Sequence, residues 1–262
     1  MAKRRNSMFA EVRLQKICSL LRENGEVSVA DLCDRFSASA ATVRADLAKL
    51  EAQNQLKRTH GGAILVDGPI QELTTTEKMT HNIEAKAAIA QKALEYIRPG
   101  MAIALDTGTT MMELAKRIQN IPNLTTITND TEISLCLEQI RGIDILLLGG
   151  LVRKQFHCTV GTLVQQMLDQ LHVDILFLAT NGLNLQHGLS TPSIEMGNIK
   201  RKLIDVSSKV ILLVDSSKLD NNSLIYFAQL SDVDVIISDA DLGERLRSDP
   251  KTQHIEFVRA EI

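Results

Sequence analysis

Six aliphatic runs in the C-terminal two thirds of the chain constrain its fold more than any other feature. They are MAIALD, LTTIT, IDILLLG, VDILFLA, KVILLVD and VDVIISD, which begin at residues 101, 124, 143, 173, 209 and 233. Strands buried on both faces of a parallel sheet read as nearly continuous Val, Ile and Leu. Helical spacing fits between the runs at residues 111–118, 131–140, 162–171 and about 195–206. The sequence therefore predicts an α/β domain with an open, mostly parallel sheet and helices on both faces.

Charge separates this part of the chain from what precedes it. The net charge of −3 combines a basic segment, residues 1–66, which has 11 Lys and Arg against 7 Asp and Glu, with an acidic remainder that has 18 against 25. A basic segment joined to a larger acidic one fits nucleic-acid binding by the first and a different task for the second. A chance partition of charge is the alternative.

The basic segment carries the pattern of a winged helix-turn-helix. Apolar spacing predicts a helix over residues 9–23, a short one in SVADLCDRF capped by Ser28, and a third that starts at Ser39 in SASAATVRADLAKLEAQN. Val43, Leu47 and Leu50 form the packing face of the third helix. Two short helices about three residues apart have helix-turn-helix spacing. The turn at Gly61-Gly62 in QLKRTHGGAILV predicts a hairpin, which would be the wing.

In this motif the second helix enters the major groove with residues near its N-terminus. Thr42 can contact a thymine methyl group or a phosphate, and Arg44 can pair with guanine or a phosphate. The candidate DNA contacts are Ser39, Ala40, Ala41, Thr42, Arg44, Ala45 and Lys49 in the helix and Lys57, Arg58 and His60 in the wing. The alternative is a three-helix structural or protein-binding module.

Three segments follow from these patterns. We predict a winged helix-turn-helix domain over residues 1–66 and the α/β domain over residues 82–262. Between them, residues 67–81 are polar and hold Gly68 and Pro69, which is typical of a linker.

Polar residues and glycines cluster where the predicted strands end. Ligands of open α/β sheets bind beyond the carboxyl ends of the strands. DTGTT offers three hydroxyls, a glycine and a helix N-terminus, which favour an anion such as phosphate, and Lys218 is a further anion partner. The candidate site consists of Asp106, Thr107, Gly108, Thr109, Thr110, Thr128, Asn129, Gly149, Gly150, Gly161, Asn181, Gly182, Asp215 and Lys218. Taken alone, DTGTT is equally a capped turn, and Asp215 with Lys218 a solvated ion pair.

The residues around the third helix and the wing resemble those of DeoR-type bacterial transcription regulators. The likeness covers Ser39, Thr42, Val43, Arg44, Asp46, Leu47, Arg58 and His60 to Ala63. It continues through KAAIAQKALEYIRPGMAIALDTGTT, TITND, LLLGG, VGTL, LFLATNGL, GLSTP and LLVDSSK. The chain departs from the family pattern at Ala38, at Ala45, where a second Arg is common, and at Asn54, where Gly is common. The loss of that Arg implies an operator of its own.

The resemblance implies a C-terminal domain similar to the sugar-phosphate isomerase group that binds a phosphorylated sugar or a related metabolite. It also implies a homo-oligomer, a dimer or a tetramer, which symmetric DNA sites favour. An isomerase or deaminase would need a general base and an acid near the substrate. Asp106, Asp215, Glu195 and Lys218 could take those roles, but Glu195 is displaced from the acidic position that is usual in the family.

The sequence lacks Ser-His-Asp spacing, a P-loop and a metal-ligand cluster. Its four cysteines form no CxxC pair, which suggests neither a zinc site nor a disulfide framework. We expect no metal and no cofactor. We expect a transcription regulator that binds double-stranded operator DNA, a repressor of a carbohydrate operon whose effector changes operator affinity. A sugar-phosphate isomerase or deaminase with an attached DNA-binding domain, and a DNA-binding architectural protein, are the alternatives. Without a signal peptide or an apolar run that spans a bilayer, a cytoplasmic location is expected.

Overall fold

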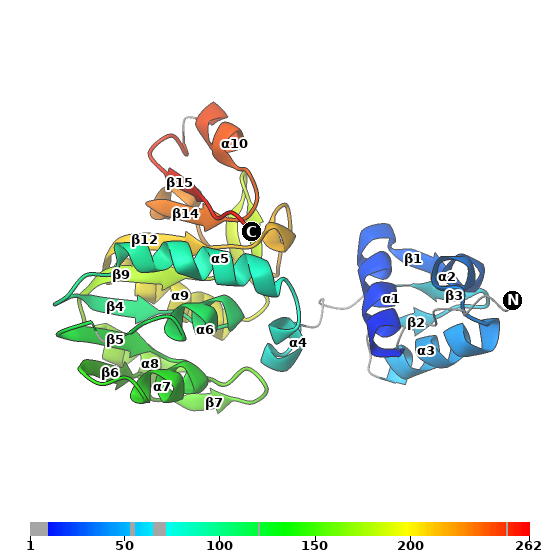
Figure 1. Cartoon of the computed structure of the whole chain (residues 1–262), viewed down its shortest axis with the longest axis horizontal. Coiled ribbons are helices and arrows are strands. Elements are labelled where there is room, and N and C mark those ends of the chain that lie inside the picture. The colour runs from blue at the N-terminus through cyan, green and yellow to red at the C-terminus, as the bar shows by residue number, and fades with distance from the viewer. Residues whose placement is uncertain (1–9, 53–55, 65–71, 120, 250) are drawn as a thin grey trace, which may run out of the picture. The chain divides into compact units, whose positions relative to one another are not determined.

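The computed structural model describes residues 10–52, 56–64, 72–119, 121–249 and 251–262, which form two compact units (Figure 1). The first unit is Met1–Gln71 and the second is Glu72–Ile262. Phe9, Asn54 and the predicted linker residues 67–71 lie outside the described residues. None of the described helices is long and apolar enough to cross a membrane.

The first unit is the predicted helix-turn-helix. It contains α1 (Ala10–Asn24), α2 (Val29–Phe36) and α3 (Ala40–Ala52). Ser28 caps α2 by accepting a hydrogen bond from the amide of Asp31, and the left-handed backbone of Ser37 ends that helix. Ser39 Oγ accepts from the amide of Thr42, which caps α3. The predicted packing face of α3, together with apolar residues of α1 and α2, is buried in one core.

The wing has one strand more than the predicted hairpin. Strands β2 (Lys57–Arg58) and β3 (Gly62–Ile64) pair antiparallel as expected, and β1 (Glu26–Ser28) pairs with the other edge of β3. β1 has only three residues, too few to show a strand pattern in the sequence. Gly62 lies directly against β1, because a Cβ atom there would stand 1.9 Å from the carbonyl oxygen of Val27.

The second unit is built on the predicted parallel sheet. Its strands are β4 (Ala102–Leu105), β5 (Leu124–Thr128), β6 (Ile143–Leu147), β9 (Val173–Leu178), β12 (Ser207–Leu213), β14 (Val235–Ser238) and β15 (Glu256–Arg259). They lie in the order β15-β14-β12-β9-β4-β5-β6, and each neighbouring pair is parallel. The first six in chain order are the six aliphatic runs, and β15 was not predicted.

Helices cover both faces of this sheet, as predicted (Figure 1). One core packs α5 (Ile83–Ala93), α6 (Thr109–Ala115) and α7 (Thr131–Glu138) against Ile103 and Leu105 of β4. The other packs α8 (Thr162–Leu168), α9 (Ile194–Asp205) and α10 (Gly243–Ser248) on the face that Ala104 shares. Successive residues of a strand point to opposite faces, so each aliphatic run supplies both cores.

Short elements outside the main sheet were missed. They are the hairpin of β7 (Leu151–Arg153) and β8 (Cys158–Val160), and a small sheet of β10 (Gly182–Asn184), β11 (Gly188–Thr191) and β13 (Ile225–Ala228). Residues 72–81, which the sequence analysis places in the linker, belong instead to the second unit. They contain α4 (Thr75–Met79), whose capping box joins Thr74 and Glu77. The TTTE pattern was the signal for that box.

Candidate functional site

The candidate DNA-contacting side chains stand on the outer face of α3 and on the wing. Ala41, Arg44, Ala45 and Lys49 are exposed, while Val43 and Leu47 between them are buried. The wing residues Lys57, Arg58 and His60 are also exposed, and Ala40, Thr42 and Ser39 lie at the start of the helix. This placement leaves Arg44 free to reach a base or a phosphate.

Ion pairs hold α3, the helix predicted to enter the major groove, in place within its unit. Arg13 of α1 binds Asp46 of α3 through both carboxylate oxygens, and the pair is nearly buried. Glu51 at the end of α3 accepts hydrogen bonds from Arg58 at its backbone amide (2.9 Å) and its Nε (2.8 Å). Arg58 therefore ties the wing to the recognition helix, a contact that sequence reasoning did not foresee.

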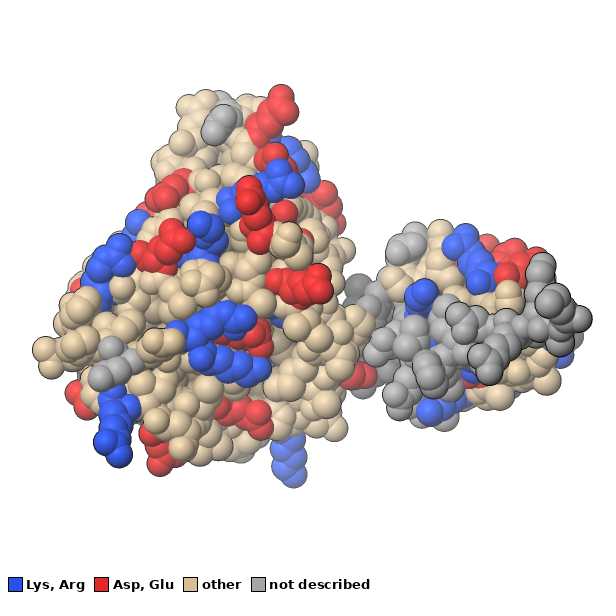
Figure 2. Space-filling view, in the orientation of Figure 1, with Lys and Arg blue, Asp and Glu red and all other residues tan. Residues whose placement is uncertain are grey.

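The parallel sheet brings the second set of predicted residues to one edge. Asp106, Asn129, Asn181 and Asp215 follow β4, β5, β9 and β12, which are four consecutive strands of the sheet. On the visible face of this unit Lys and Arg alternate with Asp and Glu, so that face carries no field of a single sign (Figure 2).

Asp106 is fully buried and forms an ion pair with Lys200 of α9, which is 3% exposed. Asp106 Oδ2 also accepts a hydrogen bond from the amide of Ala179 at 3.0 Å, and Lys200 Nζ donates to the Ala179 carbonyl at 3.0 Å. The second carboxylate oxygen, Oδ1, is buried without a hydrogen-bond partner among the described residues. An unpaired buried acceptor is costly unless a donor reaches it.

The DTGTT loop turns directly into α6. Gly108 has a φ of +116° and precedes the helix, which begins at Thr109 rather than at the predicted Met111. Asp130 accepts a hydrogen bond from the Gly108 amide (3.3 Å) and caps α7 through the amides of Glu132 and Ile133. Burial raises the pKa of Asp130 to about 6. Asp130 thus connects this loop to the next helix. Its neighbour Asn129 was named as a site residue from the sequence, and Asp130 was not.

The β7–β8 hairpin lies across the ends of β5 and β6. Asn129 Nδ2 donates to the Thr159 carbonyl at 2.8 Å, and Thr159 Oγ1 donates to the Leu148 carbonyl at 2.6 Å. Asn129 Oδ1, like Asp106 Oδ1, is buried without a partner among the described residues. Gly150 approaches the Val160 carbonyl so closely that a Cβ would stand 2.6 Å from it. Gly149, Thr128 and Gly161 border the same hairpin.

Asp215 and Lys218 lie at the next strand end. Burial opposes the charged form of Asp215, but Lys218 and hydrogen bonds from Ser217 and Asn82 hold its pKa below the usual value. Lys218 Nζ has no hydrogen bond or ion pair with any described residue. Lys86 of α5 is 5% exposed and donates to the carbonyls of Lys78 and His81. Burial lowers the pKa of Lys86, the charge of Asp215 opposes this, and the charges of Lys218 and Lys78 lower the pKa further.

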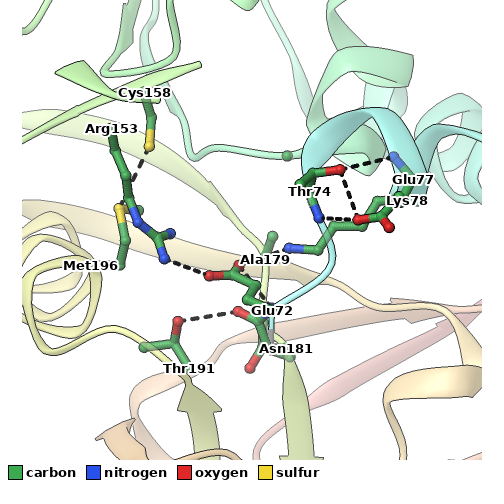
Figure 3. Close-up of polar contacts among 12 residues, drawn as sticks. Glu72, Thr74, Glu77, Lys78, Arg153, Cys158, Ala179, Asn181, Thr191 and Met196 are labelled. Atoms are coloured by element: carbon green, nitrogen blue, oxygen red, sulfur yellow. Dashed lines mark hydrogen bonds and ion pairs between the residues drawn. The ribbon is translucent and has the colours of Figure 1, made fainter. Parts of the chain in front are cut away.

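Glu72, in the predicted linker, reaches the same edge (Figure 3). Its carboxylate pairs with Lys78 Nζ (2.7 Å) and Arg153 Nη2 (2.8 Å) and accepts from Asn181 Nδ2 (3.2 Å). Burial lowers the pKa of Lys78, the pair with Glu72 opposes this, and the nearby Lys218 and Lys200 lower it further. Lys78 thus lies close enough to Lys86, Lys200 and Lys218 to be repelled by each of them.

Sequence reasoning named most of the strand-end residues and missed the charged partners that other segments supply. Gly182 is in β10, where a Cβ would stand 2.4 Å from the carbonyl of Asn221, so this glycine is needed for close packing. Lys200 had a signal, since it lies on the face of α9 shared by Met196, Ile199 and Leu203. No local pattern pointed to Glu72 or Arg153. Among the residues that the structure describes, no group of His, Cys, Asp and Glu could hold a metal ion.

Both units match known protein families. Residues 13–68 match the model described as the DeoR-like helix-turn-helix domain, and residues 81–240 match the DeoR C-terminal sensor domain. The HTH-type transcriptional regulator GlpR of Haloferax volcanii is 32% identical over 96% of this chain and 98% of its own. The putative aga operon transcriptional repressor of Escherichia coli O157:H7 is 33% identical over 90% of each chain.

The chain also has a distant likeness to solved structures. Ribose 5-phosphate isomerase A from Methanocaldococcus jannaschii is 20% identical over 53% of this chain and 55% of its own, with a TM-score of 0.40.

Proposed function

The chain belongs to the DeoR family of DNA-binding transcriptional regulators, and from this premise we propose that it represses a carbohydrate-utilisation operon in response to a phosphorylated sugar. The helix-turn-helix binds the operator, and the sensor unit binds the effector at the carboxyl edge of its sheet. The relatives are named as regulators, and the chain is a regulator rather than an enzyme. The name of the aga operon repressor supports an operon as the target of repression.

One observation carries this proposal: four lysines lie near the edge of the sheet that also holds buried acceptors without a donor. The lysines are Lys78, Lys86, Lys200 and Lys218. Phosphate oxygens are strong acceptors for lysine, and Lys218 Nζ is unpaired among the described residues. Sugar hydroxyls are donors for Asp106 Oδ1 and Asn129 Oδ1, which lack them in the described part of the chain. The hydroxyls and the helix start at Thr109 and Thr110 support anion binding. A ligand with one anionic end and several hydroxyls would meet both needs.

The regulation requires unequal binding of the effector to two states of the protein. A ligand shifts an equilibrium only through its differential affinity, and allosteric coupling is typically about 1–3 kcal/mol, a change of about 5- to 150-fold. Two helix-turn-helix units of a homo-oligomer, a dimer or a tetramer, would bind the half-sites of a symmetric operator. The effector would alter their spacing or order.

An electrophoretic shift assay tests the function directly. The purified chain is bound to DNA from upstream of its own gene and titrated with a panel of phosphorylated sugars. We expect at least one sugar that binds the protein to change its operator affinity about fivefold or more. The sensing proposal fails if every phosphorylated sugar that binds leaves operator affinity unchanged.

Arg44→Ala is expected to weaken operator binding by about 10- to 100-fold, the loss of one good base contact. Arg44 is exposed on α3, so the substitution should leave the fold intact. Fluorescence anisotropy against operator and unrelated DNA gives the specificity ratio. Lys16→Ala, an exposed change on α1, is the control. Equal losses in both variants would argue against a base contact by Arg44.

Lys218→Ala is expected to preserve operator binding and to reduce the affinity for a phosphorylated sugar by about tenfold or more, since a charge-assisted hydrogen bond is lost. Titration calorimetry and the shift assay measure the two properties separately. Lys251→Ala, an exposed change in the same unit, is the control. A Lys218→Ala protein that loses operator binding but keeps its effector affinity would refute this division of roles.

A further inference from the structure

The Glu72 carboxylate lies in a largely buried site where three separate segments supply hydrogen-bond donors. Lys78 belongs to α4, Arg153 to β7, and Asn181 to the segment after β9 (Figure 3). The Glu72 side chain is 10% exposed. Burial opposes its charged form, but Lys78 and Arg153 hold its pKa below the usual value. Two cations and an amide thus enclose one carboxylate.

The same donors would suit an anionic group of a ligand. Arg and Lys form charge-assisted hydrogen bonds with carboxylate and phosphate oxygens alike. Phe156 supports the cluster, because the Arg153 guanidinium lies 3.8 Å and Lys78 Nζ 5.7 Å from the centre of its ring. Glu72 therefore occupies Lys78 and Arg153, two strong hydrogen-bond donors for an anion, at the edge proposed to bind the effector.

The position of Glu72 in the chain gives this contact a regulatory consequence. Glu72 is the first residue of the second unit, and only residues 65–71 separate it from the end of the wing strand β3. The other carboxylates described at the edge, Asp106, Asp130 and Asp215, come one or two residues after the ends of strands of the sheet. Glu72 alone of these four lies on the segment that leads to the DNA-binding unit.

We propose that, without effector, the Glu72 carboxylate occupies these donors and so holds the junction, residues 72–81, in place on the sensor unit. The anionic group of the effector then takes the place of the carboxylate. The inference rests on the proposed phosphorylated effector. Both carboxylate oxygens are already used, Oε1 by Lys78 and Asn181 and Oε2 by Arg153, so little capacity remains to accept sugar hydroxyls. Glu72 is not part of the capping box that Thr74 and Glu77 form, and its contact with Lys78 joins it to α4.

Titration calorimetry of the full chain tests the competition, with inorganic phosphate, glucose 6-phosphate and fructose 6-phosphate as probes. Glu72→Gln removes the competing charge and keeps the shape, so it should bind these probes about tenfold more tightly than wild type. Glu72→Asp keeps the charge but shortens the side chain by one methylene, so its affinity for the probes should lie between those of wild type and Glu72→Gln. The affinity of Glu72→Asp decides the question if Glu72→Gln does not fold. Glu138→Gln, an exposed change on α7, should match wild type.

Hydrogen exchange in residues 72–81 provides a second readout. Saturating wild type with the tightest-binding probe should raise exchange there, because the junction is released. The inference is overturned if Glu72→Gln binds the probes as wild type does or more weakly, or if exchange in this segment falls. If neither wild type nor any Glu72 variant binds a phosphorylated probe, the proposed effector class is itself wrong and the inference fails with it.

Discussion

Replacing Lys200 with methionine is expected to destabilise the C-terminal unit by about 3–5 kcal/mol, because it leaves the carboxylate of Asp106 buried without its cation. Asp106 is 0% exposed and lies at the end of β4, near the centre of the sheet. Its remaining donor would be the amide of Ala179. Methionine has nearly the length of lysine, so lost packing contributes little. For a unit of this size the unfolding temperature should fall by roughly 10 °C.

Calorimetric unfolding of the full chain measures this shift. Lys202→Met is the matched control, since Lys202 is on the same helix and its ion pair with Asp169 is partly exposed. Such a pair contributes about 0–1 kcal/mol, so the control should unfold close to wild type. Adding Asp106→Asn to Lys200→Met should restore part of the stability by removing the unpaired charge. Equal shifts in Lys200→Met and Lys202→Met would contradict a buried pair.

The sequence was sufficient wherever a pattern is local. Val43, Leu47 and Leu50 were predicted to pack together, and each is at most 2% exposed. Ser28 was predicted to cap a helix and does so. The six aliphatic runs are all strands of one sheet, and five of them are largely buried, while the edge strand β6 is only partly buried.

Features that depend on distant segments could not be predicted in this way. The pair of Asp106 and Lys200 joins residues 94 positions apart, and the pair of Glu72 and Arg153 joins residues 81 positions apart. The sequence indicated where ligands should bind, since the carboxyl ends of parallel strands share an edge. Apart from Lys218, it did not indicate which cations reach that edge, because α4, α9 and β7 bring the others there through tertiary packing.

Some missed features nevertheless had local signals. Asp130 immediately follows the predicted Asn129, and an acidic residue before a helix is a common cap. A lysine on the apolar face of an amphipathic helix, as at Lys200, requires a buried partner. The strands of β1, β7 and β10 each have three residues, which is too short for an alternating pattern to be recognised.

Gly62→Ala is expected to destabilise the N-terminal unit by about 3 kcal/mol, at the upper end of the usual cost of overpacking. The new Cβ would stand 1.9 Å from the carbonyl oxygen of Val27 and 2.9 Å from the Cα of Ser28, both backbone atoms of β1. No side-chain rotation relieves such a contact, so β1 and β3 must separate. A small domain has little stability to lose. Operator binding should therefore fall steeply, while probe binding to the sensor unit persists.

Gly61→Ala separates close packing from loss of glycine flexibility. Gly61 precedes Gly62 in the same turn, and a Cβ there would have no neighbour within 4 Å. Neither glycine has a positive φ, so neither needs glycine for its backbone conformation. Gly61→Ala should thus be close to wild type in its calorimetric unfolding temperature and in its operator affinity. If both alanine variants lose operator binding equally, the turn itself contacts DNA. If neither does, β1 is not the strand that holds the wing, and the register of Ser28 with Gly62 is wrong.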